Sequence, residues 1–150
     1  MDQHEVGKID GYLEAVSYLK GDGTGFLFCS INKSKEIAES VTKCFPRSGE
    51  KFEVSPVKNW QREVLPVLKN WILVRRRILS DGDSEQIDER LYDCFIEILL
   101  DYLDNPITWF VVSHLSECGN QVSTTNEAIW DCFAISTPSG CYVLHCGWDS

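Results

Sequence analysis

IWDCFAISTPSGCYVLHCG, residues 129–147, contains the two apolar runs and the turn from which the sheet of this chain can be predicted. Two runs in it, 129–136 and 141–147, are rich in β-branched and aromatic residues, which favour strands. The four residues between them, Thr137-Pro138-Ser139-Gly140, suit a type I turn. The stretch therefore predicts two antiparallel strands joined by a tight turn.

Residues 107–115 form a third apolar run of strand type, separated from the hairpin by a long polar segment, 117–127. Residues 26–31 are short, apolar and bounded by turn residues, and offer a fourth strand. The fold class expected is α+β, with an antiparallel β-meander of three to four strands packed against several helices. A chain of 150 residues is expected to form one domain, 1–150.

Helical periodicity dominates the remainder of the chain. Residues 10–20 carry apolar side chains at helical spacing and end at a glycine-rich segment, and a second helix is expected over 34–44. The middle predicts a central helical hairpin. Its first helix starts at Ser55-Pro56 and continues to Leu79, with Pro66 forcing a kink or restart. Its second helix runs over 83–104, after a turn at 80–82, and stops at Asn105-Pro106.

Charge is distributed unevenly along the chain. The formal net charge is -9, and no lysine or arginine follows Arg90, whereas seven of the fourteen basic residues lie between Lys51 and Arg77. An acidic surface disfavours nucleic acid or an anionic membrane as the principal partner. A basic protein surface is its natural complement, so we expect a basic protein partner, no direct nucleic acid and no membrane.

The expected environment is intracellular. Residues 1–6 lack the charged and apolar regions of a secretory signal, and no apolar run approaches the roughly 20 residues that a membrane span requires. Seven cysteines occur at irregular spacing, unlike a disulfide framework. We therefore expect a cytoplasmic protein with reduced and mostly buried thiols.

The second helix of the hairpin separates an apolar face from an acidic one. Ile87, Leu91, Cys94, Phe95, Ile98 and Tyr102 share one arc, and Glu89, Asp93, Glu97, Asp101 and Asp104 share the opposite arc. Like charges four residues apart destabilise a helix by roughly 0.2–0.5 kcal/mol per pair. Either cations of the first helix neutralise the row, for example Lys69 level with Asp93, or part of it stays open for a partner.

The sequence patterns that could indicate a catalytic or metal site are weak. His114, Cys118, Cys141 and His145 could converge on zinc, but no CxxC pair occurs, and residues four apart on a strand lie about 13 Å apart. A Cys-His-Asp arrangement using Asp131 is permitted and equally unsupported. Residues 21–25 resemble a phosphate loop in composition only, since they precede a strand. We predict no catalytic residue, no metal ligand and no cofactor.

In general character the chain resembles the small acidic immunity proteins that neutralise bacterial toxins. That resemblance implies an inhibitor whose carboxylates cover the basic cleft of a toxin, such as a nuclease, with aromatic anchors beside them. A small cysteine- or metal-dependent enzyme and a non-catalytic subunit or adaptor stay open as alternatives. The candidate partner-binding residues are Asp93, Glu97, Asp101, Asp104, Glu117, Glu127, Trp130, Asp131, Trp148 and Asp149.

Overall fold

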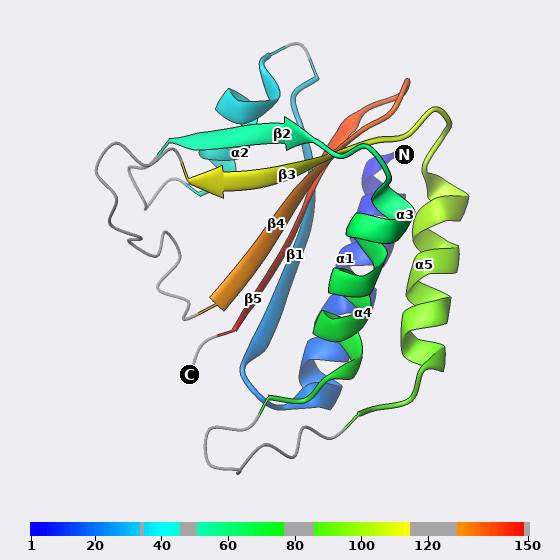
Figure 1. Cartoon of the computed structure of the whole chain (residues 1–150). Coiled ribbons are helices and arrows are strands. Elements are labelled where there is room, and N and C mark those ends of the chain that lie inside the picture. The colour runs from blue at the N-terminus through cyan, green and yellow to red at the C-terminus, as the bar shows by residue number, and fades with distance from the viewer. Residues whose placement is uncertain (34, 46–50, 77–85, 115–128, 149–150) are drawn as a thin grey trace.

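A five-stranded antiparallel sheet forms the centre of the molecule in a computed structural model, which describes residues 1–33, 35–45, 51–76, 86–114 and 129–148. The fold is α+β (Figure 1). The strands lie in the order β1-β5-β4-β3-β2. Their bounds are β1 Thr24–Ile31, β2 Phe52–Pro56, β3 Thr108–His114, β4 Ile129–Ser136 and β5 Cys141–Trp148. The helices are α1 Gln3–Lys20, α2 Ile37–Cys44, α3 Trp60–Glu63, α4 Leu65–Leu73 and α5 Arg90–Tyr102.

The predicted meander is present as β3, β4 and β5, each antiparallel to the next. The early strand is present too, and it pairs along its whole length with β5. The expectation of three to four strands was nevertheless too low, because β2 pairs with β3 as a fifth strand. Ser55-Pro56 ends this strand instead of starting a helix. Since β2 lies at the edge of the sheet, the missing N–H of Pro56 is tolerated there.

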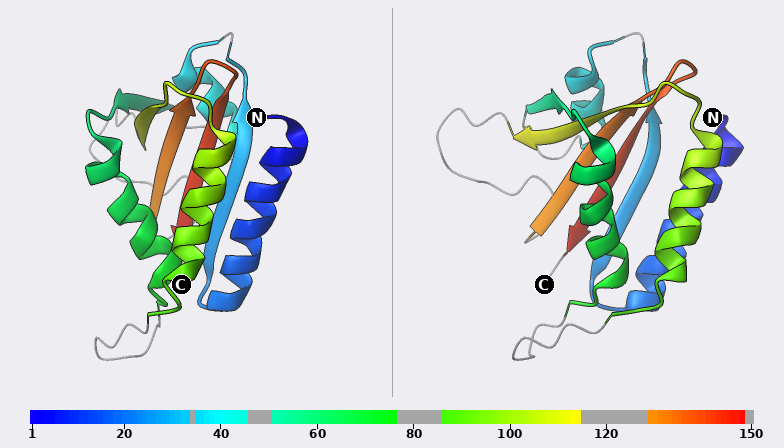
Figure 2. Two further views of the ribbon diagram at one scale, coloured as in Figure 1. Left: turned by 90° about the vertical axis from the view of Figure 1, so that its right-hand side faces the viewer. Right: turned by 45° about the vertical axis from the view of Figure 1, so that its right-hand side comes forward.

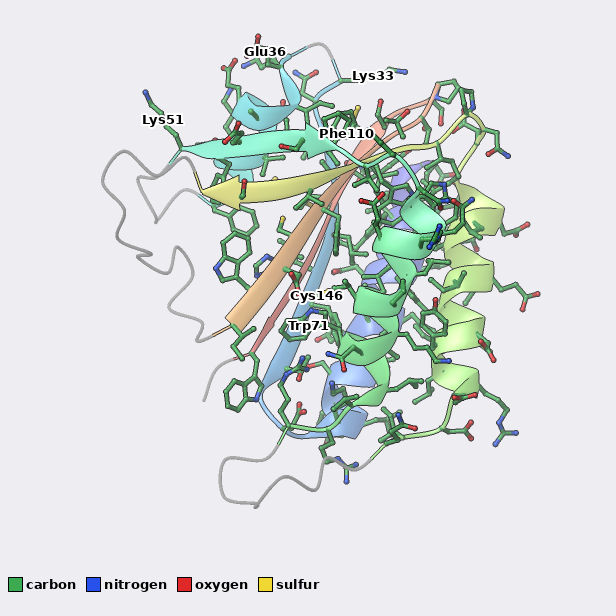
Figure 3. All side chains as sticks on the ribbon, viewed as in Figure 1. Lys33, Glu36, Lys51, Trp71, Phe110 and Cys146 are labelled. Carbon is green, nitrogen blue, oxygen red and sulfur yellow. The ribbon has the colours of Figure 1, made fainter. Side chains whose placement is uncertain are left out.

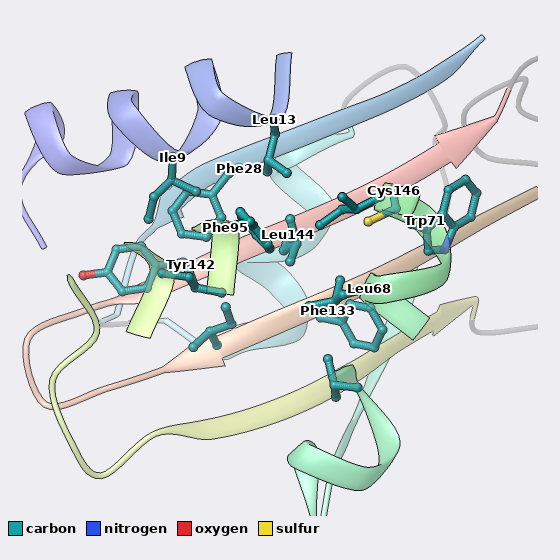
Figure 4. Close-up of a cluster of buried hydrophobic side chains, with 14 of the residues drawn as sticks. Ile9, Leu13, Phe28, Leu68, Trp71, Phe95, Phe133, Tyr142, Leu144 and Cys146 are labelled. Atoms are coloured by element: carbon teal, nitrogen blue, oxygen red, sulfur yellow. The ribbon is translucent and has the colours of Figure 1, made fainter. Parts of the chain in front are cut away.

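Three helices cover one face of the sheet. Figure 1 shows α1, α4 and α5 on the same side of the strands, and Figure 2 shows α5 lying between α1 and α4. Their apolar sides meet inward-facing residues of β1, β4 and β5 in the main core. Figure 4 shows Ile9 and Leu13 of α1 and Phe95 of α5 converging on Phe28 and Leu144.

A second, smaller core lies on the opposite face, under α2. Val41 of α2 is fully buried there against Phe52, Val112 and Val143. Alternate residues of the same strands thus serve the two cores, as the twofold side-chain period of a strand requires. The sheet is therefore buried on both faces, which explains why β5 is apolar along most of its length.

The predicted helical hairpin is only roughly matched. Its first half is split into α3 and α4, and Pro66 lies in the first turn of α4, where its missing N–H costs nothing. Its second half begins at Arg90 instead of residue 83. Between the two helices the chain forms an isolated bridge from Val74 to Gln86. The turn expected at 80–82 lies outside the described residues.

The α1 helix is longer than expected and shields the outer edge of β1. It begins at Gln3, with a capping box between Asp2 and Glu5. Three polar side chains at seven-residue intervals then reach β1. Gln3 Nε2 donates to Ser30 Oγ at 3.0 Å, Asp10 Oδ1 accepts from the Phe28 amide at 2.9 Å, and Ser17 Oγ donates to the Thr24 carbonyl. These contacts occupy an edge that would otherwise be open to another strand.

Candidate protein-binding surface

The orientation of α5 about its own axis is fixed by contacts with both neighbouring helices. Phe95 and Leu99 are buried in the main core. The Tyr12 ring of α1 stacks on Phe95 with centroids 6.3 Å apart, and its hydroxyl donates to the Leu91 carbonyl at 2.8 Å. Tyr92 donates to the Leu65 carbonyl on the other side at 3.4 Å. With this side of α5 held against the body, the opposite side faces solvent.

Three carboxylates, Asp93, Glu97 and Asp101, lie on that exposed side at successive four-residue steps and are called here the α5 acidic row. Within the described part of the chain, no lysine, arginine or histidine nitrogen lies within 4.0 Å of their oxygens. Cys94 is exposed as well, whereas the sequence placed it on the apolar arc. The acidic face of the helix is therefore present as predicted, with one cysteine added to it.

Three cations of the helices α1, α4 and α5 are engaged with partners outside the row. Lys69 Nζ of α4 pairs with Glu89 at 3.6 Å and lies 5.7 Å from the Tyr92 ring centroid, so the expected pairing of Lys69 with Asp93 was wrong. Arg90 forms a close pair with Asp88 at 2.6 Å. Lys8 of α1 lies over the Tyr102 ring, 5.9 Å from its centroid. These cations flank the row without neutralising it.

The helix itself does not favour the row. Asp93 in the first turn is stabilised by the positive end of the helix dipole, but Asp101 lies in the last turn, which has no basic residue. The two like-charge pairs, Asp93 with Glu97 and Glu97 with Asp101, add roughly 0.2–0.5 kcal/mol each of repulsion. The row thus carries an intrinsic energetic cost in the isolated protein.

Asp104, just beyond α5, is exposed but already hydrogen-bonded within the chain. Its Oδ1 accepts from the Ser139 hydroxyl at 2.5 Å and its Oδ2 from the Ser139 amide at 3.1 Å. The hydroxyl bond from Ser139 is the main reason that the pKa of Asp104 falls below its usual value. Asp104 therefore ties the end of α5 to the β4–β5 turn.

Asp131 and Trp148 lie away from the row, at the end of the sheet where α1 and α4 terminate. Asp131 is partly buried, and its Oδ2 accepts from the Trp71 indole at 2.6 Å. Trp148 is partly buried too, and its indole donates to the Asp22 carbonyl at 2.7 Å. Asp131, a candidate partner-binding residue, therefore already has a hydrogen-bond partner inside the chain.

A buried ionic network adjoins these residues and was not anticipated from the sequence. Lys20 is wholly buried, donates to the Trp71 and Val74 carbonyls and lies 3.8 Å from Asp22. Burial lowers the pKa of Lys20 to about 8, against the opposing effect of Asp22. Burial alone would raise the pKa of Asp22, but hydrogen bonds led by the Arg76 amide hold it below its usual value. The network joins the α1–β1 turn to the end of α4.

The only sequence signal for this network is the position of Lys20 immediately before the glycine-rich segment. Gly21 ends α1 with φ at 58°, which brings Asp22 close to Lys20. Figure 3 shows Trp71 and Cys146 close together near this end of the sheet. The Cys146 thiol is fully buried, and burial raises its pKa well above the ordinary value.

The remaining candidate partner-binding residues lie apart from the α5 acidic row or outside the described residues. Trp130 is partly buried on the face of the sheet that α2 covers, with its ring 6.0 Å from that of His145. Glu117, Glu127 and Asp149 lie outside the described residues. The structure thus brings together Asp93, Glu97 and Asp101 and separates them from the tryptophans expected beside them.

The described residues offer neither a metal site nor a membrane-spanning helix. They contain no group of three or more histidine, cysteine, aspartate or glutamate side chains placed to hold a metal ion. None of their helices combines the length and apolar character needed to cross a bilayer. No protein-family model, curated protein or solved structure matches the chain.

Proposed function

We propose that this protein is a protein-binding inhibitor that covers the basic cleft of a partner with the α5 acidic row. The partner class that fits best is a bacterial toxin, in particular a nuclease, and the protein then acts as its immunity protein. The observation that carries the proposal is the row itself: three exposed carboxylates on a rigidly held helix, with no cation of the described chain within ion-pair distance.

The negative charge of the row is unfavourable in the free protein and favourable against a cationic surface. Repulsion within the row destabilises the free protein, and a cationic surface would turn that repulsion into attraction. Nuclease clefts carry positive potential because they bind phosphates, so an acidic protein is steered toward them at high association rates. The net charge of -9 strengthens the same long-range attraction.

Rigidity is the second supporting argument. Tyr12, Phe95 and Tyr92 hold α5 against α1 and α4, so little conformational freedom remains to be lost on binding. Asp131 and Trp148 already satisfy partners inside the chain, so the proposal depends on the row and not on them.

The test compares two triple variants with the same change in charge. D93N/E97Q/D101N removes the row, and E36Q/E39Q/E53Q removes three exposed carboxylates from α2, its N-cap and β2. Glu36 lies at the far side of the molecule from α5 (Figure 3). Each purified protein is immobilised and exposed to lysate of the source organism at increasing NaCl, and the retained proteins are identified by mass spectrometry.

We expect a basic enzyme to be retained by the wild type and the control and lost by the row variant. Rising salt should release it, because exposed ion pairs are screened. The wild type should then inhibit that enzyme in a purified assay. Retention of the same partner by the row variant would contradict the proposal. If the wild type retains a basic enzyme but does not reduce its activity, the alternative of a non-catalytic subunit or adaptor would be favoured instead.

A further inference from the structure

Two cysteines far from the α5 acidic row approach each other on the opposite face of the sheet. Cys29 lies in β1 and Cys44 is the last residue of α2. Their sulfur atoms are 3.8 Å apart, which is van der Waals contact with no room for an intervening atom. Fifteen positions of sequence separate them, so a bond between them would close a sizeable loop.

The surroundings make this pair different from the other thiols. Both side chains are partly exposed, whereas Cys132, Cys141 and Cys146 are buried. A small oxidant can therefore reach Cys29 and Cys44 without unfolding the sheet. Cys94 is also exposed, but it lies on α5, on the other side of the sheet. Among the described cysteines, Cys29 and Cys44 are the two that are both partly exposed and in contact with another thiol, each with the other.

The contact between the two thiols shifts their pKa values in opposite directions. The interaction with the Cys29 thiol is the main cause that lowers the pKa of Cys44, and burial opposes it. The same interaction, together with burial, raises the pKa of Cys29. Cys44 is thus the thiol more readily ionised, and a thiolate is the form that attacks an oxidant. Cys29 lies in position to react next.

We propose that Cys29 and Cys44 are a redox modification site, which peroxides convert reversibly into an intramolecular disulfide. The Cys44 thiolate attacks one peroxide oxygen, the O–O bond breaks, and Cys44 becomes a sulfenic acid as hydroxide or alkoxide leaves. The Cys29 sulfur then attacks the Cys44 sulfur, the S–O bond breaks, and water leaves with the proton of Cys29. Overall two thiols lose two electrons and two protons, and hydrogen peroxide is reduced to two waters.

Closure requires the sulfurs to approach from 3.8 Å to about 2.05 Å. Cys44 is at the end of α2, and no side-chain hydrogen bond caps the start of that helix. A small shift of this eight-residue helix can therefore supply the movement while β1 stays paired with β5. The disulfide would fasten α2 to the sheet and stabilise the second core around Val41 and Phe52.

The first experiment treats the full-length reduced protein with hydrogen peroxide, blocks the free thiols with an alkylating reagent and maps the peptides. Denatured protein should show seven reactive thiols before oxidation and two fewer after it. The cross-linked peptide should join Cys29 to Cys44, and dithiothreitol should restore both thiols. Sulfinic or sulfonic acids at these positions without any cross-link, or a preferred disulfide elsewhere, would overturn the proposal.

The second experiment measures thermal unfolding of the oxidised and reduced protein. A disulfide closing a loop of this size should raise the melting temperature by roughly 5–10 °C. C29S and C44S should abolish the increase, whereas C94S should retain it. A variant that fails to fold is replaced by C29A or C44A, which keep an apolar contact. An increase that persists in both single variants, or no increase in the wild type, would contradict the assignment. None of these readouts depends on the inhibitor proposal.

Discussion

The Trp71 indole donates a 2.6 Å hydrogen bond to Oδ2 of Asp131, joining α4 to the central strand β4 across sixty positions of sequence. The Arg76 guanidinium lies over the same indole ring, 4.0 Å from its centroid. Burial lowers the pKa of Arg76, and the nearby carboxylates of Asp22 and Asp131 oppose that shift. Asp131 thus accepts the hydrogen bond of the buried Trp71 indole and also offsets the positive charge of the half-buried Arg76 guanidinium.

Asp131→Ala should therefore destabilise the protein by about 1–3 kcal/mol, because the buried Trp71 N–H loses its acceptor. Asp131→Asn keeps a carbonyl oxygen in place and should cost less. Urea unfolding monitored by tryptophan fluorescence measures both. Equal stability of the alanine variant and the wild type would show that the hydrogen bond contributes nothing net.

Glu97→Lys should stabilise the isolated protein by about 1 kcal/mol, since it replaces two repulsions with two attractions, to Asp93 and Asp101. Glu97→Gln should give roughly half of that effect. Thermal unfolding at low salt measures the change, and added NaCl should reduce it. The same lysine variant should weaken binding of a basic partner, so stability and binding should change in opposite directions. A lower melting temperature would show that the row is already neutralised in the free protein.

Lys20 should make stability depend on pH in the alkaline range. Its folded pKa, about 8, lies below the ordinary value of 10.5, so the unfolded chain binds the proton more tightly between these values. Its contribution to stability therefore rises with pH from about 8 to 10.5, while below pH 8 the full cost of burying the ammonium applies. The measurement is the difference in unfolding free energy between the wild type and Lys20→Met. The stability of the wild type relative to Lys20→Met should rise between pH 8 and 10.5. If it stays constant or falls over this range, the pKa of Lys20 is not lowered in the folded protein.

Asp10→Ala should open the outer edge of β1 locally, because the Phe28 amide loses the acceptor that lies 2.9 Å away. The expected cost is about 1 kcal/mol. Amide hydrogen exchange should accelerate at Phe28 while the amides of α5 keep their protection. Asp10→Asn retains an oxygen at the same place and serves as the control. Unchanged exchange at Phe28 in the alanine variant would show that the edge is protected by other means.

The parts of the fold that the sequence predicted are those with strong periodicity or clear turn chemistry. The strands β4 and β5 flank a four-residue turn, and α5 keeps Phe95 and Leu99 on one buried side. The strand β2 was missed because Ser55-Pro56 matches a helix start as well as the end of an edge strand. Only pairing with β3, distant in sequence, decides between the two.

The candidate site was predictable only in part for a similar reason. The positions of Asp93, Glu97 and Asp101 follow from helical geometry alone, so the sequence placed them correctly on one side. Whether Lys69 reaches Asp93 or Glu89 depends on where α5 begins, and the sequence predicted that start at residue 83, seven residues too early. The contact of Asp131 with Trp71 depends on how α4 crosses the sheet, which local patterns do not encode.

The pairing of β1 with β5 has a consequence for biosynthesis. Thr24 lies opposite Trp148 and Ile31 opposite Cys141, so the first of the five described strands in chain order is paired with the last of them. Until translation passes residue 148, β1 has α1 along one edge and no strand along the other. The pairing of β1 therefore waits for the synthesis of β5, and a product terminated before β5 would expose an unpaired edge that other nascent chains could join.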